Sequence, residues 1–299
     1  MTATLPPTTE LPYSLTSSMS RTRKLKNRLA TVWLYAALLV ALVPLGLVIF
    51  FVVQKGSAIF SWDFLTKDIP TSRRTIGPGM GPAVVGTILI TGAAALMAIP
   101  LGILGAVYLN EYGKASRLAG LIRFMANVMT GVPSIVMGLF IYVTWVLKFG
   151  TNGFAGSLAL ACLMLPVVIR STEEMLKLVP DELRQASFAL GNRKWRTVLT
   201  VVLPAALGGI TSGCMLAIAR AAGETAPLLF TIGVTTKVNL NLFEGGNTAL
   251  APQIFAGALQ PFEGIQQRAW GAALVLIIIV FIFTFAARLV AQRFALRHG

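Results

Sequence analysis

Charged side chains are scarce in this sequence. They make up only 12% of its 299 residues, whereas 56% of the residues are hydrophobic and the mean hydropathy is +0.76. Soluble domains carry about 25% charged residues. The shortage excludes an ordinary soluble domain and indicates a chain that lies mostly within a membrane.

Histidine and cysteine are nearly absent. The only histidine is His298, and the two cysteines, Cys162 and Cys214, lie inside apolar runs. No His or Cys metal centre, disulfide framework or buried Ser-His pair can be built from this set. The sequence also lacks a GxxxxGK[ST] phosphate loop and a GxSxG elbow. We therefore expect no enzyme activity, metal or cofactor in this chain.

Long apolar runs recur along the sequence and predict an all-α polytopic membrane protein with six transmembrane helices. The first run has a basic leading end and no clear cleavage site, so we interpret it as an uncleaved signal anchor. The predicted spans are residues 29–53, 83–109, 124–147, 154–175, 204–222 and 269–291. The predicted segments around them are a disordered basic tail 1–28, an external loop 54–82, a membrane domain 83–292 with an external segment 223–268, and a C-terminal tail 293–299.

Basic residues dominate the charge, with 25 Lys and Arg against 11 Asp and Glu. Most of them fall in alternate segments, from Arg21 at the start of the chain to Arg297 at its end. Positive residues favour the cytoplasmic side, so we expect both termini in the cytoplasm of a bacterial inner membrane. This placement also indicates contact with anionic lipid rather than with nucleic acid.

A charged island between two apolar runs, ELRQASFALGNRKWRTVLTVVLP, starts at Glu182. Its first part has the pattern of a short amphipathic helix, which Gly191 and Asn192 should end because both tolerate positive φ. An ordered helix beside the membrane is suited to bind a soluble partner. The apolar stripe consists of Leu183, Ala186, Phe188, Ala189 and Leu190, interrupted by Arg184 and Gln185, and Arg193, Lys194 and Arg196 then surround Trp195.

The spacing in this island resembles the coupling-loop motif of ABC importer permeases. The family pattern is Glu-Ala-Ala, three residues, Gly, nine residues, Ile, any residue and Leu-Pro. The match consists of Gln185-Ala186-Ser187, Gly191, Val201 and Leu203-Pro204. The resemblance implies that the loop 178–197 docks on an ATPase. Residues assigned to this contact are Asp181, Glu182, Arg184, Gln185, Ala186, Ser187, Leu190, Gly191 and Trp195.

Two arginines are placed inside or at the ends of apolar runs. Arg220 should lie in the outer part of the fifth span, with Glu224 four residues on. The pair is either a self-satisfied ion pair or an anion contact in a translocation path, because intramembrane charges usually face an aqueous cavity. Arg170, predicted at the inner end of the fourth span, is either a cytoplasmic anchor or a second anion contact. Pro133 either breaks the third span towards a cavity or makes a packing kink.

Five further segments extend the resemblance to phosphate-importer permeases of the PstA type, over about residues 77–290. They are GPAVVGTILI, IPLGILGAVYLNEY, GVPSIVMGLF, EEMLKLVPDELRQASFALG and LAIARAAGETAPLLF. The resemblance implies a five-helix MetI-like core and a phosphate path that includes Arg220, Glu224, Thr225 and Arg170. It also implies a PstC-type paralogue, two PstB-type ATPases that bind ATP and Mg, and an external PstS-type phosphate-binding protein.

Three alternatives stay open at this point. The chain could be a permease for another oxyanion, such as phosphonate, molybdate or sulfate, although the run from Arg220 to Leu228 argues against this. It could be an integral-membrane enzyme, although no His, Cys or carboxylate cluster lies at membrane depth. It could also signal phosphate status, as a scaffold or sensor.

Overall fold

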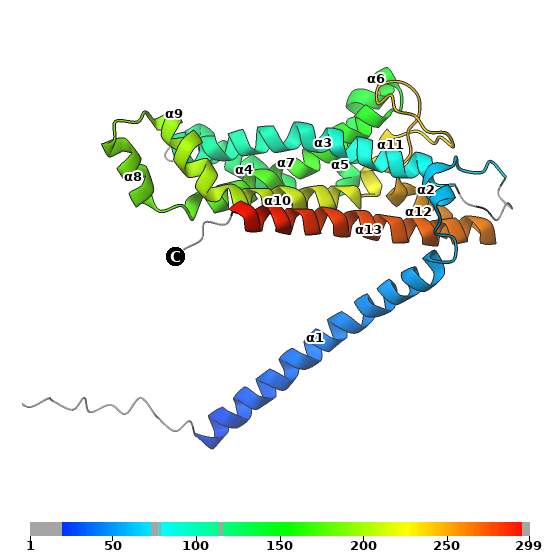
Figure 1. Cartoon of the computed structure of the whole chain (residues 1–299), viewed down its shortest axis with the longest axis horizontal. Helices are drawn as coiled ribbons and strands as arrows, with labels where there is room; N and C mark the ends of the chain where they lie inside the picture. The colour runs from blue at the N-terminus through cyan, green and yellow to red at the C-terminus, as the bar shows by residue number, and fades with distance from the viewer. Residues whose placement is uncertain (1–19, 73–76, 78, 114–115, 295–299) are drawn as a thin grey trace, which may run out of the picture. The chain divides into compact units, whose positions relative to one another are not determined.

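Helices are the only regular elements in the part of the chain that the structure describes, which is residues 20–72, 77, 79–113 and 116–294 (Figure 1). The structure is a computed structural model. It divides the chain into two compact units, residues Met1–Phe51 and Val52–Gly299. The predicted all-α class is confirmed.

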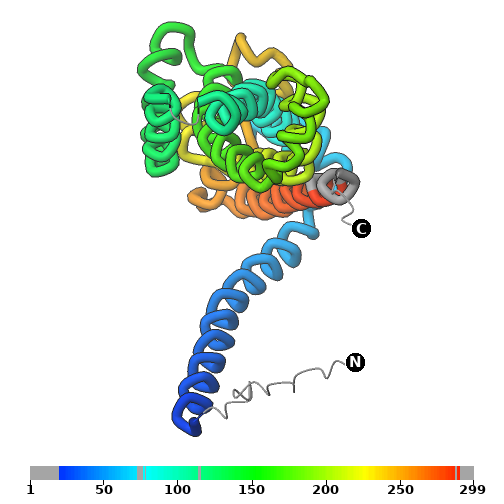
Figure 2. Tube along the Cα trace, turned by 90° about the vertical axis from the view of Figure 1, so that its left-hand side faces the viewer, coloured from blue at the N-terminus to red at the C-terminus, as the bar shows by residue number. Residues whose placement is uncertain are grey.

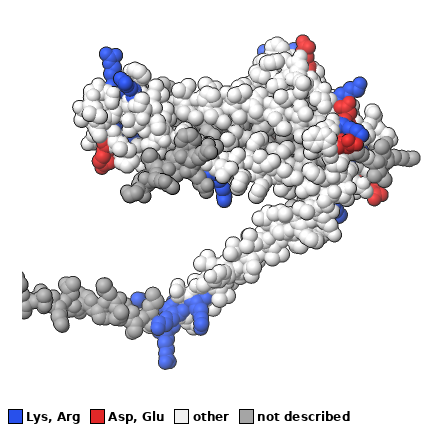
Figure 3. All heavy atoms as spheres, viewed as in Figure 1, with Lys and Arg blue, Asp and Glu red and all other residues white. Residues whose placement is uncertain are grey.

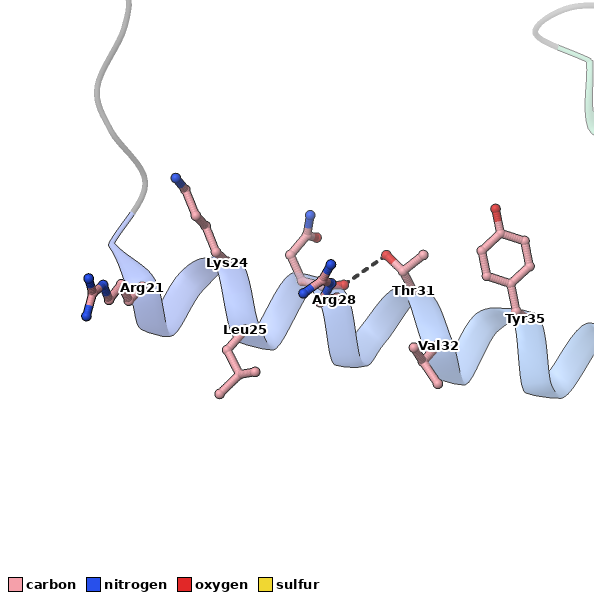
Figure 4. Close-up of a pocket in the computed structure, with 8 residues that line it drawn as sticks. Arg21, Lys24, Leu25, Arg28, Thr31, Val32 and Tyr35 are labelled. Carbon is pink, nitrogen blue, oxygen red and sulfur yellow. Dashed lines mark hydrogen bonds between the residues drawn. The ribbon is translucent and has the colours of Figure 1, made fainter.

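The first unit contains most of α1, which runs over Arg21–Gly56. A surface depression follows its basic end, lined by Arg21, Lys24 and Arg28 and, farther along the helix, by Tyr35 (Figure 4). The prediction of a disordered tail over 1–28 is therefore wrong from Arg21 onward. Arg, Lys and Leu are good helix formers and extend the helix of the apolar run towards the N-terminus. Residues 1–19 of the predicted tail lie outside the described residues.

The second unit is a bundle in which four long helices, α3, α7, α10 and α13, run side by side (Figure 1). The short helices α8 and α9 lie at one end of this bundle and α2, α6 and α12 lie towards the other. Its elements are α2 (Trp62–Thr66), α3 (Gly81–Val107), η1 (Tyr108–Tyr112), α4 (Arg117–Gly131), α5 (Ser134–Ile141), η2 (Tyr142–Val146), α6 (Leu147–Phe149), α7 (Gly153–Lys177), α8 (Asp181–Ala189), α9 (Lys194–Thr197), η3 (Val198–Val202), α10 (Leu203–Ala222), α11 (Ala226–Thr231), α12 (Leu250–Ala258) and α13 (Glu263–Phe294).

Five of the described helical stretches are long and apolar enough to cross a membrane, and a bent pair could supply a sixth span. The predicted third span, 124–147, is not one straight helix. α4 and the stretch Ser134–Phe149 meet at 106°. The break falls at Val132-Pro133, since a residue that precedes proline is pushed out of the helical region, and Val132 has φ −71° and ψ 127°.

The ends of several predicted segments also differ. The segment 223–268, predicted to be external, contains α11, α12 and the start of α13, with a non-helical stretch between α11 and α12. The fifth span begins well before residue 204, since α9 and the π-helical turn η3 run directly into α10. The loop 54–82, predicted to be external, contains α2, and α3 begins at Gly81.

Small residues let the helices of the bundle approach closely, as is common in membrane proteins. A Cβ atom on Gly138 of α5 would lie 2.6 Å from Cα of Pro227 in α11, and one on Gly213 of α10 would lie 2.5 Å from the Ser171 hydroxyl of α7. The largest buried cluster joins α3, α7 and α10. Its members include Ile90, Ala94, Ala98, Leu160, Met164, Val168, Ala206 and Ile210.

Charged side chains are unevenly distributed along the bundle. Figure 2 looks along the long helices from the end that carries α8 and α9. On the face that Figure 3 draws, Lys, Arg, Asp and Glu side chains of this unit gather mainly at its two ends, and the middle is largely uncharged. An uncharged middle suits the hydrocarbon layer, where an unpaired charge is costly.

Candidate functional site

The helix α8 has the expected start and stop. Asp181 and Glu182 lie in its first turn, where negative charge complements the helix dipole. At its end the Gly191 amide donates to the Phe188 carbonyl (2.9 Å) and the Asn192 amide donates to the Ser187 carbonyl (3.2 Å), with Gly191 at φ +78°. This is a Schellman ending, which needs a residue that tolerates positive φ. The prediction that Gly191 ends the helix is confirmed.

The packed side of α8 is polar. Arg184 and Ser187 are its two buried residues. The Ser187 hydroxyl shares a hydrogen bond of 2.9 Å with that of Thr197 and accepts one of 3.2 Å from the Asn192 side-chain amide. These bonds join α8 to α9, so the two short helices form one ordered loop.

The apolar residues predicted to form a stripe on α8 are exposed. Leu183, Phe188 and Leu190 are 40%, 44% and 82% exposed. Asp181, Glu182, Gln185, Ala186 and Gly191 are exposed as well, and so is Trp195 on α9. Nearly every residue assigned to the ATPase contact is thus accessible. The exceptions are Arg184 and Ser187, which the motif spacing alone could not distinguish from their neighbours.

Arg184 contacts three elements at once. Its guanidinium donates to the Glu111 carboxylate at the end of η1 (3.0 Å from Nη2), to the Leu176 and Val179 carbonyls at the end of α7 (2.9 and 2.6 Å), and to the Asp181 carboxylate (3.0 Å). Sequence reasoning missed Glu111, which precedes Arg184 by 73 residues. The one signal was a carboxylate at the end of an apolar run.

Arg220 and Glu224 do form the expected pair, at 3.6 Å between Nε and Oε1. The helix does not continue between them, because α10 ends at Ala222 and the Glu224 amide donates to the Ala221 carbonyl in a tighter turn. The Arg220 side chain is 70% exposed and that of Glu224 is 18% exposed. Thr225 caps the start of α11 through its backbone only.

Arg170 lies two turns before the end of α7 rather than at the end of the helix. It pairs with Glu174 at 3.3 Å and lines a cavity of about 210 Å³ together with Arg123, Glu173 and Lys177. Arg123 and Lys177 each reach the Glu173 carboxylate at 2.9 Å. Arg220 lines a different cavity, between α7 and α10, so the structure does not bring the two predicted anion contacts together.

This arrangement of membrane-length helices, with a broken span and an exposed ordered loop at one end, defines the class of protein: a polytopic α-helical membrane protein. The chain belongs to the family of binding-protein-dependent transport system inner membrane components, whose model matches residues 98–296.

Similar proteins cover almost the whole chain. It is 44% identical to the phosphate transport system permease protein PstA of Mycobacterium leprae, over 86% of each chain. It is 42% identical to the phosphate transport system permease protein PstA 1 of Mycobacterium tuberculosis, over 90% of this chain and 88% of the relative. The protein named PstA in Yersinia pestis is 41% identical over 90% of each. None of these names denotes an enzyme.

Solved transporters share the fold at low identity. A bacterial ABC transporter involved in the import of alginate superposes with a TM-score of 0.59 at 14% identity, covering 90% of this chain and 99% of that one. The MetNI methionine ABC transporter in an inward-facing conformation superposes with a TM-score of 0.57 at 18% identity, covering 71% of this chain and 93% of that one. The predicted MetI-like fold is confirmed.

Proposed function

We propose that this chain is one permease subunit of an ATP-driven importer of inorganic phosphate. The observation that carries the proposal is its identity of 41 to 44% to proteins named phosphate transport system permease, over most of both chains. ATP hydrolysis belongs to a partner, which also holds Mg. This chain supplies half of the membrane path.

The exposure of Arg220 supports its place in that path. A guanidinium on a membrane helix costs about 2.5–3.5 kcal/mol at the centre of the bilayer and less towards its surface. Because Arg220 is 70% exposed and its partner lies 3.6 Å away, Glu224 does not shield it from its surroundings. The exposed side of α10 therefore faces a second permease or an aqueous path rather than lipid. A guanidinium there can bind phosphate oxygens through its planar fork of donors.

Arg170 is the second candidate contact. Three cations and two carboxylates surround its cavity, so the local charge is positive by one. A cavity with net positive charge favours binding of the anion as it leaves the path, although Glu174 competes with the anion for the Arg170 guanidinium.

The outward side of α8 supports the role in coupling. Leu183, Phe188 and Leu190 are exposed in this loop, and so are Gln185 and Glu182. Exposed apolar side chains on an ordered helix suit binding to a groove in a soluble partner. ATP-driven closure of two PstB-type ATPases would then rock this chain against a PstC-type permease, which a PstS-type binding protein loads from outside.

Uptake of labelled anions tests the proposal. The importer, reconstituted in lipid vesicles with ATP on the ATPase side and the binding protein opposite, should accumulate phosphate. Arsenate, sulfate and molybdate are measured in parallel, and a complex whose ATPase cannot hydrolyse ATP is the control. Accumulation of sulfate or molybdate instead of phosphate would overturn the substrate assignment.

A further inference from the structure

We propose that Arg184 does not dock on the ATPase but transmits the motion of the loop to α3 and α7. This inference rests on the proposed function, because it concerns how an importer couples ATP hydrolysis to transport. It is carried by a junction of four side chains, Arg184, Glu111, Tyr112 and Lys194, which we call the Arg184 junction.

Burial separates Arg184 from the docking side of α8. Its side chain is 10% exposed, whereas the neighbouring Asp181 side chain is 71% exposed. A guanidinium that is turned into the protein and already makes hydrogen bonds there cannot also reach a partner's groove. Its contacts therefore act within this chain.

The contacts of Arg184 join the loop to α7. The last carbonyl groups of a helix have no partner within that helix, and a cation at this end also complements the helix dipole. Arg184 supplies a hydrogen-bond donor and a positive charge at this end of α7. It donates to the Leu176 carbonyl in the last turn of α7 and to the Val179 carbonyl just after it. A displacement of α8 must pull on this end of α7 or break these bonds.

The same guanidinium joins the loop to α3. Nε and Nη2 of Arg184 lie 3.3 and 3.0 Å from one oxygen of Glu111, whose side chain is 6% exposed. The Asn110 side-chain amide donates to that same oxygen at 2.8 Å and orients the carboxylate. Hydrogen bonds between charged groups are stronger than those between neutral groups.

A second contact repeats the connection on the other side of the loop. The Lys194 ammonium in α9 lies 5.0 Å from the centre of the Tyr112 ring, a cation–π distance. Glu111 and Tyr112 are consecutive residues of η1, so both helices of the loop contact the same π-helical turn at the end of α3. π-Helical turns are rare and occur frequently at functional sites.

The consequence is a rigid path from the loop to the bundle. α3 and α7 pack closely along their length, where Gly102 of α3 abuts Val168 of α7. When the ATPase moves α8, the Arg184 junction carries α3 and α7 with it. Without the junction, ATP would still be hydrolysed and the loop would move, but the bundle would follow it incompletely.

The decisive measurement is the amount of anion taken up per ATP hydrolysed by the reconstituted complex. Glu111→Gln removes the ion pair but keeps the size of the side chain. We expect this ratio to fall about fivefold or more, with the amount of assembled complex and the rate of ATP hydrolysis within about twofold of wild type. The matched control is Asp63→Asn, which removes the carboxylate of the exposed Asp63–Lys67 pair on α2 and should leave the ratio unchanged.

A second pair of variants guards against a failure of Glu111→Gln to assemble. The Tyr112 side chain is half exposed, so its replacement leaves folding largely intact. Tyr112→Phe keeps the ring and should retain the wild-type ratio, whereas Tyr112→Leu should lower it about twofold.

An unchanged ratio in Glu111→Gln, or a parallel fall of uptake and hydrolysis, would overturn the proposal, as would equal ratios in Tyr112→Phe and Tyr112→Leu. A wild-type complex that imports another oxyanion would contradict only the phosphate assignment. The ratio is then measured with that anion.

Discussion

Arg220 has two alternative roles, a structural ion pair with Glu224 or a contact with the transported anion, and experiment can distinguish them. At 3.6 Å and with one partner 70% exposed, the pair contributes about 0–1 kcal/mol to stability. Such a weak pair adds little to the stability of α10. The proposed anion contact, by contrast, needs the accessible guanidinium that Arg220 presents.

The double variant Arg220→Gln with Glu224→Gln should therefore assemble normally and lose uptake by about tenfold or more, since one lost anion contact of ~1.4 kcal/mol has this effect. Arg220→Lys should also lower phosphate uptake, because an ammonium lacks the planar set of donors with which a guanidinium binds an anion. The measurement is phosphate uptake normalised to assembled complex.

The matched control for this prediction is Asp63→Asn with Lys67→Gln, which removes another pair spaced by four residues, at 2.6 Å, between α2 and the residue that follows it. It should retain uptake. Recovery of most uptake in the Arg220 and Glu224 double variant would instead make Arg220 a structural partner of Glu224.

Among the elements, α5 and α11 pack so closely that their contact constrains the position of the broken span. Their contact passes through Gly138, where a Cβ atom would lie 2.6 Å from Cα and 3.0 Å from the carbonyl oxygen of Pro227. Both atoms belong to the backbone and cannot rotate away. α11 follows Glu224 and Thr225 directly, so this contact also sets the position of the predicted anion path.

Gly138→Ala should therefore destabilise the chain by about 1–3 kcal/mol, as overpacking of a tight contact does. The thermal unfolding midpoint of the purified complex in detergent is the measurement. Gly131→Ala is the control, because a Cβ atom on this helical glycine meets nothing within 4 Å. Equal midpoints for the two variants would show that α5 and α11 separate without cost.

At the scale of the whole molecule, the bias of basic residues predicts which end of the bundle faces the cytoplasm. Arg193, Lys194 and Arg196 lie in the exposed loop at the end that carries α8. Positive residues favour the cytoplasmic side, which agrees with a loop that binds a cytoplasmic ATPase. The segment between α11 and α12 then lies outside.

Cysteine labelling tests this orientation in a chain whose Cys162 and Cys214 are first replaced by alanine. A cysteine at Val234, which is 89% exposed, should react with an impermeant thiol reagent added outside intact cells. A cysteine at the exposed Arg193 should react only in inverted vesicles. Labelling at Arg193 from outside would contradict the cytoplasmic placement of the loop and of both termini.

The sequence by itself determined the fold class, most of the membrane-spanning runs and the family. These depend on local properties: a hydrocarbon layer selects apolar runs of a given length, and a helix end selects a residue such as Gly191 that tolerates positive φ. The local pattern also indicated that Arg220 and Glu224 could meet, since four residues separate them.

Only the tertiary structure decided how distant residues meet. The burial of Arg184 depends on Glu111 and on the end of α7, which no periodicity within α8 could reveal. Likewise, a proline indicates a break but not the 106° between α4 and the stretch that follows, which the packing of α5 on α11 supports. Arg170 lines a cavity between α4 and α7, whereas Arg220 lines one between α7 and α10. Contacts of this kind arise from side-chain volumes across helices, and a single sequence does not order those in space.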